Sequence, residues 1–152
     1  MSKRLVISYS ITDRAIADKV RDELIKAGYD VWIAHKDIKG AVDWQQTILN
    51  TIDKRDGLVL IWSSTAAESE NVREEIGIAR VFLKPIFPIH AHPTKEVPSL
   101  PNEINHLQVI HMGSLDLNII ELKERLADPN KNDMQYTESA EHGFIPKVPT
   151  PY

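Results

Sequence analysis

The sequence contains no cysteine among its 152 residues. Disulfide bonds, thiol catalysis and cysteine-based zinc sites are therefore excluded. Basic residues are not in excess either, because 18 Lys and Arg are outnumbered by 22 Asp and Glu, which gives a net charge of −4. A basic stripe that would follow a phosphate backbone is missing, so we expect no nucleic-acid partner.

Long apolar runs are missing as well. The first residues contain too short an apolar run for a signal peptide, and no later stretch is long enough to span a bilayer. We therefore expect a cytoplasmic protein without a membrane partner. The length is sufficient for one domain with a sizeable core.

The chain does contain a regular alternation of strand and helix patterns. Short apolar runs rich in β-branched residues predict buried strands at 5–8, 31–33, 57–62, 85–90 and 107–110. An apolar period of about 3.6 residues predicts helices at 13–27, from about 43 to 52, at 69–83 and at 117–127. Gly28 is expected to end the first helix.

This alternation predicts the fold class. Strands and helices with short connections form a parallel sheet that is covered on both faces. We predict an α/β, flavodoxin-like three-layer sandwich with a five-stranded parallel sheet of order 2-1-3-4-5. Residues 1–127 would form this domain, and 128–152, where the pattern is lost, a C-terminal tail with little independent structure.

One acidic residue of the third helical stretch lies on its apolar side. At about 100° per residue, Glu75 projects into the apolar arc and Glu74 points away from it. A carboxylate that faces a core is costly unless it has a partner or a chemical role. Glu75 is therefore the candidate chemical centre, and the alternative is a structural carboxylate paired with a basic residue or a backbone amide. The arc comprises Val72, Ile76, Ala79, Phe82 and Leu83.

Polar residues follow the first and third predicted strands. In a sheet of this order, ligands bind beyond the carboxyl ends of these two strands, and Glu75 is expected to reach that edge. Alternatively, the hydroxyls that follow the first strand would cap the next helix. Asn71 and Glu74 have the spacing of an N-cap and N3 pair, which predicts a capping role for Glu74. The two groups are Ser8, Tyr9 and Ser10, and Trp62, Ser63 and Ser64.

Several stretches, in their order and spacing, resemble the TIR (Toll/interleukin receptor/resistance) domain family. They are 5–10 with Asp13, 28–32, 37–44, 58–63, 69–75 and 86–89, and the resemblance extends from about 5 to 127. Many bacterial and plant members cleave NAD⁺ at the nicotinamide–ribose bond. Those members carry a glutamate four residues after a tryptophan, in the helix that follows the third strand. The resemblance implies that Glu75 is this catalytic glutamate, with Asn71 in the place of the tryptophan.

The resemblance also implies a reaction and a set of contacts. NAD⁺ is a substrate in this reaction and not a cofactor. Because nicotinamide leaves a cationic glycoside as a neutral base, no cofactor or metal is needed. A carboxylate near the ribose stabilises the oxocarbenium-like transition state, and a position in the first helical turn would favour its charge. Residues 35–42 resemble the loop that lies over the nucleotide in this family, with Ala41 where glycine is usual. The implied substrate-binding residues are Ser8, Tyr9, Ser10, Arg14, Ala34, His35, Lys36, Trp62 and Asn71.

The implied function is that of a stand-alone bacterial NAD⁺ nucleosidase that forms ADP-ribose or a cyclic isomer. Such enzymes act in antiphage defence and produce a signal for a separate effector. They self-associate or bind other TIR domains. A non-catalytic scaffold or host TIR mimic is the alternative that Asn71 and Ala41 favour. A nucleoside deoxyribosyltransferase-like enzyme, which shares the layers and a glutamate that attacks a sugar carbon, is a third hypothesis.

Overall fold

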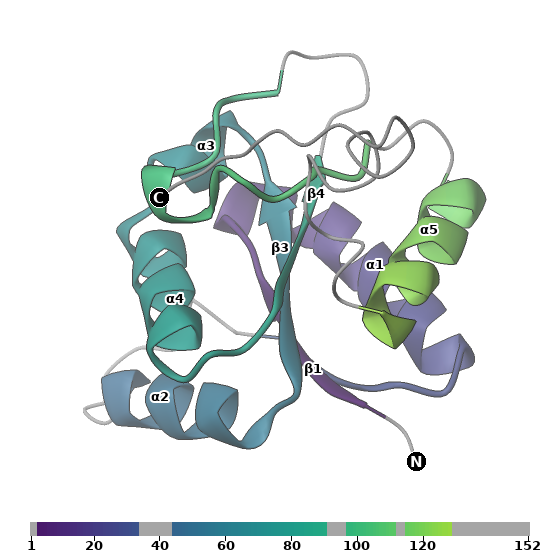
Figure 1. Cartoon of the computed structure of the whole chain (residues 1–152), viewed down its shortest axis with the longest axis horizontal. Helices are drawn as coiled ribbons and strands as arrows, with labels where there is room; N and C mark the ends of the chain where they lie inside the picture. Colours follow the sequence, from purple (N-terminus) through teal and green to yellow (C-terminus); the bar gives the residue numbers. More distant parts are fainter. Residues whose placement is uncertain (1–2, 34–43, 91–96, 112–114, 129–152) are drawn as a thin grey trace, which may run out of the picture.

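The computed structural model describes residues 3–33, 44–90, 97–111 and 115–128, with side chains throughout except at 44–45 and 115–119. Four parallel strands in this part of the chain form a sheet of order β2-β1-β3-β4, seen edge-on in the centre of Figure 1. Their bounds are Arg4–Ser8 for β1, Asp30–Ile33 for β2, Gly57–Trp62 for β3 and Ile86–His90 for β4.

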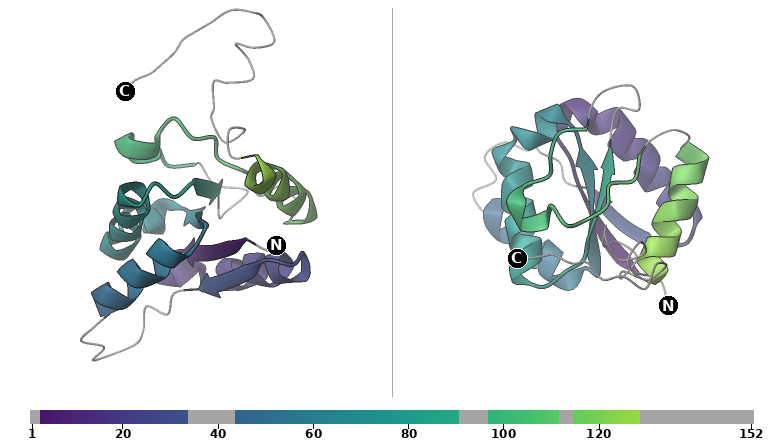
Figure 2. Two further views of the ribbon diagram at one scale, coloured as in Figure 1. Left: turned by 60° about the horizontal axis from the view of Figure 1, so that its bottom comes forward. Right: turned by 45° about the horizontal axis from the view of Figure 1, so that its top comes forward.

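Helices cover both faces of the sheet. One side carries α2 and α4, and the other carries α1 and α5, as the views in Figures 1 and 2 agree. The long helices are α1 (Arg14–Lys26), α2 (Trp44–Lys54), α4 (Glu70–Val81) and α5 (Leu115–Ala127), and the short ones are η1 (Ile11–Asp13), α3 (Ser64–Ala67) and η2 (Asn102–Ile104). The predicted three-layer α/β fold is confirmed. None of the helices in the described ranges has the length and apolar character that crossing a membrane requires.

The predicted fifth strand is only a single bridge. Ile110 pairs with Ile89 in parallel fashion, donating its N–H to the Pro88 carbonyl at 2.9 Å and accepting from the His90 N–H at 2.8 Å. Toward the amino end of β4 the pairing stops within the described residues, because Pro88 has no N–H to donate and the Gln108 carbonyl accepts from Arg125 Nη1 instead. The described sheet therefore has four strands instead of five.

The core is centred on β3. All six of its residues are buried, as expected for a central strand of a parallel sheet with helices on both faces. Gly57 begins this strand where space is short, since a Cβ there would lie 3.1 Å from Phe87 Cε2. The predicted bounds of this strand are confirmed.

Two helices end in the same backbone motif, one at glycine and the other at leucine. After α1, the Gly28 N–H donates to the Ile25 carbonyl and the Tyr29 N–H to the Leu24 carbonyl, with a Gly28 φ of +99°. This is a Schellman motif, in which glycine takes the left-handed position. The predicted end of the first helix is confirmed.

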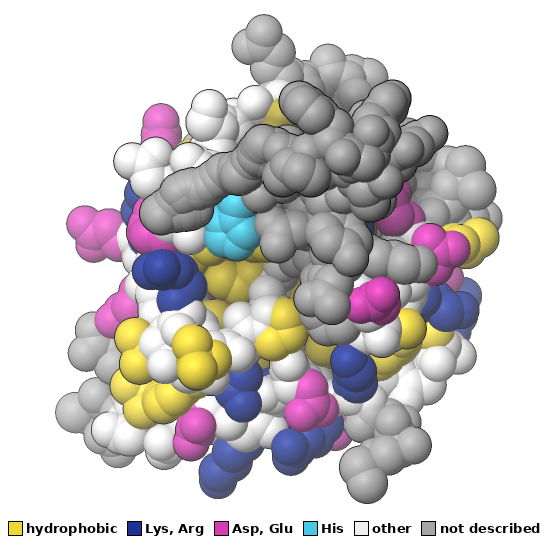
Figure 3. All heavy atoms as spheres, viewed as in Figure 1, with side chains coloured by type: hydrophobic (Ala, Val, Ile, Leu, Met, Phe, Trp, Pro, Cys, Tyr) yellow, Lys and Arg dark blue, Asp and Glu magenta, His cyan; other side chains and the backbone are white. Residues whose placement is uncertain are grey.

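Leu83 takes that left-handed position after α4. Its φ is +58°, and the Lys84 N–H donates to the Ala79 carbonyl at 2.8 Å. The predicted place of Leu83 on the apolar arc is wrong, because the helix ends at Val81 and turns the Leu83 side chain outward, where it is 88% exposed. Figure 3 shows apolar side chains gathered over this end of α4.

Replacing Leu83 by glycine is expected to raise the free energy of unfolding by about 0.5–1 kcal/mol. A left-handed conformation costs a non-glycine residue about 1–2 kcal/mol, and the added entropy of glycine in the unfolded chain offsets part of the gain. Val81→Gly is the matched control, since Val81 is also exposed but helical, and its free energy of unfolding should fall by about 0.5 kcal/mol or less. Urea denaturation followed by circular dichroism measures both, and a loss of stability in Leu83→Gly would contradict the interpretation.

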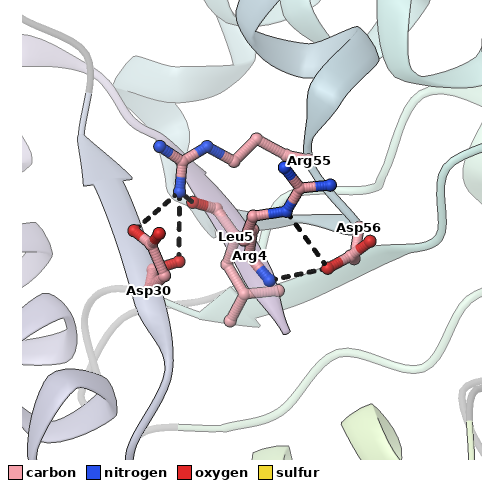
Figure 4. Close-up of polar contacts among 5 residues, drawn as sticks. All are labelled: Arg4, Leu5, Asp30, Arg55 and Asp56. Atoms are coloured by element: carbon pink, nitrogen blue, oxygen red, sulfur yellow. Dashed lines mark hydrogen bonds and ion pairs between the residues drawn. The ribbon is translucent and has the colours of Figure 1, made fainter. Parts of the chain in front are cut away.

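A polar cluster ties together the amino ends of the strands, opposite the edge where β1 and β3 end (Figure 4). Arg55 Nη1 donates to the carbonyls of Leu5 at 3.5 Å and Asp30 at 3.2 Å, and to Asp30 Oδ1 at 3.0 Å. Beside it, Asp56 Oδ2 accepts from the Arg4 backbone N–H at 2.7 Å and lies 3.8 Å from Arg4 Nε. One guanidinium thus links β1, β2 and the connection from α2 to β3.

Arg55→Ala is expected to lower the free energy of unfolding by about 1–2 kcal/mol, because it removes charge-assisted hydrogen bonds from a side chain that is only 19% exposed. Arg4→Ala is the matched control. It removes only an exposed ion pair and keeps the backbone hydrogen bond, so the expected loss is at most about 0.5 kcal/mol. Urea denaturation midpoints of the two variants measure these losses, and equal losses would refute the linking role of Arg55.

Candidate functional site

Glu75 is a buried carboxylate on α4. The helix begins at Glu70, and its N-cap Ser69 accepts from the Val72 N–H at 3.2 Å. Glu75 is 2% exposed and shares the inward side of the helix with Val72, Ile76 and Ala79, while Glu74 is exposed. The predicted inward direction of Glu75 is confirmed.

Two details of the prediction for this helix are wrong. Asn71 lies inside α4 and Ser69 is the N-cap, so Asn71 and Glu74 do not form an N-cap pair. Glu75 lies in the second turn, and the field of the helix dipole is concentrated in the first. The dipole is therefore not the main stabiliser of this carboxylate.

A hydroxyl from β1 contacts the Glu75 carboxylate directly. Ser8 Oγ, at the end of β1, donates to Glu75 Oε1 at 2.5 Å, and both side chains are buried. Hydrogen bonds from a hydroxyl to a carboxylate are short and strong where water is excluded. The interpretation of Ser8 as a helix-capping residue is wrong, since its hydroxyl is used 67 positions away.

The two aromatic candidates are core residues. Tyr9 and Trp62 are both 0% exposed, and Trp62 Nε1 donates to the Pro98 carbonyl at 2.9 Å. Because strand side chains alternate and Ser8 pairs with Leu60, Trp62 lies on the same face of the sheet as Ser8. Neither ring offers exposed surface on which a nicotinamide or adenine ring would stack.

Three of the remaining predicted site residues lie in the described part of the chain. Ser10 is 7% exposed, and its Oγ lies 3.1 Å from Thr12 Oγ1. Arg14 is the first residue of α1, and its Nε lies 3.8 Å from Asp18 Oδ1. Asn71 is exposed. Ala34, His35 and Lys36 lie outside the described residues.

Sequence reasoning missed a buried contact beside the site. Asp13 is 2% exposed, and its Oδ2 accepts from Ser63 Oγ at 2.5 Å and from Thr65 Oγ1 at 3.5 Å. Thr12 Oγ1 also donates to Thr65 Oγ1 at 2.9 Å. The sequence placed Asp13 at the start of the predicted helix 13–27, which gives no indication of Ser63 as its partner, and its side chain makes no capping hydrogen bond to that helix.

Histidines are also present at the carboxyl end of the sheet. The His90 ring is buried and lies edge-on to the ring of His111, with centroids 6.0 Å apart. Within the described ranges, no group of three or more histidine, aspartate or glutamate side chains is arranged to hold a metal ion. The Ser8–Glu75 hydrogen bond holds a carboxylate where β1 ends, and a carboxylate can stabilise a developing cation.

Comparisons with known proteins agree with this architecture. A family model described as TIR domain matches residues 5–124. The TIR domain of the Toll-related receptor TRR-2 from Hydra magnipapillata has a TM-score of 0.64 at 16% identity, over 83% of this chain and 97% of that one. The TIR domains of the activated Roq1 resistosome, which directly recognises the pathogen effector XopQ, have a TM-score of 0.50 at 17% identity, over 86% of this chain and 76% of that one.

A glycosidase has a similar fold. The CMP N-glycosidase BcmB of Clostridium botulinum has a TM-score of 0.54 at 14% identity, over 80% of this chain and 99% of that one. At these identities the likeness to solved structures shows the fold alone. No curated protein sequence matches the chain.

Proposed function

Because the chain belongs to the TIR domain family, we propose that it is an NAD⁺ nucleosidase whose catalytic residue is Glu75. The observation that carries the proposal is the buried Ser8–Glu75 pair where β1 ends. A buried carboxylate is costly for the fold, so its presence beside the edge at which sheets of this order generally bind ligands favours a chemical role. The Ser8 hydroxyl is a hydrogen-bond donor that holds one oxygen of the Glu75 carboxylate in place.

The proposed reaction needs one negative charge. The bond between C1′ of the ribose and the nicotinamide nitrogen breaks, and its electron pair leaves with nicotinamide. The Glu75 carboxylate stabilises the cationic ribose that develops, water adds its oxygen to C1′, and one proton is released. When an adenine nitrogen attacks C1′ in place of water, the product is a cyclic isomer of ADP-ribose.

The proposal requires an opening at this edge of the sheet. Glu75 is 2% exposed, so NAD⁺ reaches its carboxylate only when neighbouring groups move. TIR domains commonly self-associate, and we expect contact between copies to produce this opening. The product would serve as a signal in antiphage defence for a separate effector.

A non-catalytic TIR module is the second candidate, and the same burial of Glu75 favours it. The discriminating experiment measures base release by chromatography from NAD⁺, CMP and deoxynucleosides at high protein concentration. Release of nicotinamide from NAD⁺ that stops in Glu75→Gln supports the proposal. Release from CMP or deoxynucleosides alone would assign another N-glycosidic substrate, and no release from any of them would leave the non-catalytic module.

A further inference from the structure

Asp13 occupies the N-cap position of α1 but does not cap it. An aspartate in this position usually accepts a hydrogen bond from a backbone N–H of the first helical turn, and here that local contact is given up. The carboxylate is buried and accepts from Ser63 Oγ, 50 positions along the chain, at 2.5 Å. Its long-range contact is therefore the feature that needs a physical account.

The contact joins the two segments that carry the candidate site. Asp13 ends the loop that begins after Ser8. Ser63 follows β3 and caps α3, accepting from the Ala66 N–H at 3.1 Å, and α3 leads into α4 with Glu75. The Asp13–Ser63 and Ser8–Glu75 hydrogen bonds thus connect the same pair of segments, and both are 2.5 Å long.

Further hydroxyls join these two segments. Thr12 Oγ1 donates to Thr65 Oγ1 at 2.9 Å, and Thr65 Oγ1 lies 3.5 Å from Asp13 Oδ2. The carboxylate is the charged member of this group, and hydrogen bonds to a charge are about twice as strong as those between neutral groups. Asp13 is therefore the residue whose loss would most loosen the connection.

We infer that Asp13 is a positioning residue for Glu75: by binding Ser63 it fixes the separation of the two segments across which Ser8 meets the Glu75 carboxylate. For catalysis this inference rests on the proposed function, because only a catalytic Glu75 makes its position matter for turnover. The geometric part concerns the Ser8–Glu75 contact and is measurable without turnover.

The test uses the full chain and the carboxyl carbon resonance of Glu75, recorded by ¹³C NMR at constant pH. Ser8→Ala, which removes the hydrogen bond directly, sets the sign of the change. Asp13→Ala and Ser63→Ala are expected to shift the resonance in the same direction, and the double variant is expected to shift it no further than the larger single. Asp18→Asn is the matched control, since Asp18 is a nearby aspartate on α1, the helix that follows Asp13, and its Oδ1 lies 3.3 Å from Arg21 Nη1.

Each outcome decides the inference. A Glu75 resonance that is unchanged in folded Asp13→Ala and Ser63→Ala proteins overturns it, and so does an equal shift in Asp18→Asn. Should Asp13→Ala not fold, Asp13→Asn and Ser63→Ala supply the measurement. For an active chain we further expect kcat to fall by about 10-fold to 100-fold with KM unchanged. Absence of turnover in the wild type would refute the proposed function, while the resonance would still decide the role of Asp13.

Discussion

Glu75→Gln is expected to lower kcat for nicotinamide release by at least about 10²-fold while the protein remains folded. Glutamine keeps an oxygen that accepts from Ser8 Oγ, so the 2.5 Å contact has a counterpart in the variant. What the substitution removes is the negative charge that would face the cationic ribose. Because a neutral amide is less costly to bury than a carboxylate, the stability should not fall.

Glu74→Gln is the matched control for this prediction. The same chemical change is made one residue earlier, at an exposed side chain, so kcat should change less than about twofold, consistent with the small effect of surface substitutions. Nicotinamide release and urea denaturation are measured on both variants. Equal release by wild type and Glu75→Gln, or an equal loss in Glu74→Gln, would remove Glu75 from the catalytic role.

Trp62→Ala is expected to lower the free energy of unfolding by about 3–5 kcal/mol, the cost of removing a large aromatic side chain from a core. The ring is 0% exposed, and its Nε1 donates to the Pro98 carbonyl at 2.9 Å. Trp62→Phe keeps most of the packing and loses the hydrogen bond, so a loss of about 1–2 kcal/mol is expected.

Trp32→Ala is the comparison that separates burial from residue type. Trp32 belongs to β2 at the edge of the described sheet and is partly buried, so its removal should cost less, about 1–2 kcal/mol. Urea midpoints are measured on all three variants. A stable Trp62→Ala protein that binds NAD⁺ more weakly than wild type would instead assign this ring to substrate stacking.

Local patterns were sufficient to predict much of this fold. The buried run of β3, the end of α1 at Gly28 and the inward direction of Glu75 each depend on residues within a few positions of one another. Helix ends were harder. Ser69 and Asn71 are both good N-cap residues, and only the backbone geometry places Ser69 at the cap.

The contacts of the candidate site were beyond local patterns. Ser8 and Glu75 are 67 positions apart, and Asp13 and Ser63 are 50 apart. Ser8, Asp13 and Ser63 each have a plausible local role as a cap or a turn residue. Glu75 was predicted to reach the edge where Ser8 lies, but the individual hydrogen bonds follow only from the parallel arrangement of β1 and β3. The missing fifth strand has a similar cause, because the proline in β4 and the contact of Arg125 with the Gln108 carbonyl act together.

The proline and the bridge in β4 also bear on aggregation. A sheet edge normally offers N–H and C=O groups to which a foreign strand can add. On the outer side of β4, the His90 N–H and the Pro88 carbonyl are both bonded to Ile110, and Pro88 has no N–H to offer. These groups of β4 are therefore not available as a template for amyloid-like growth.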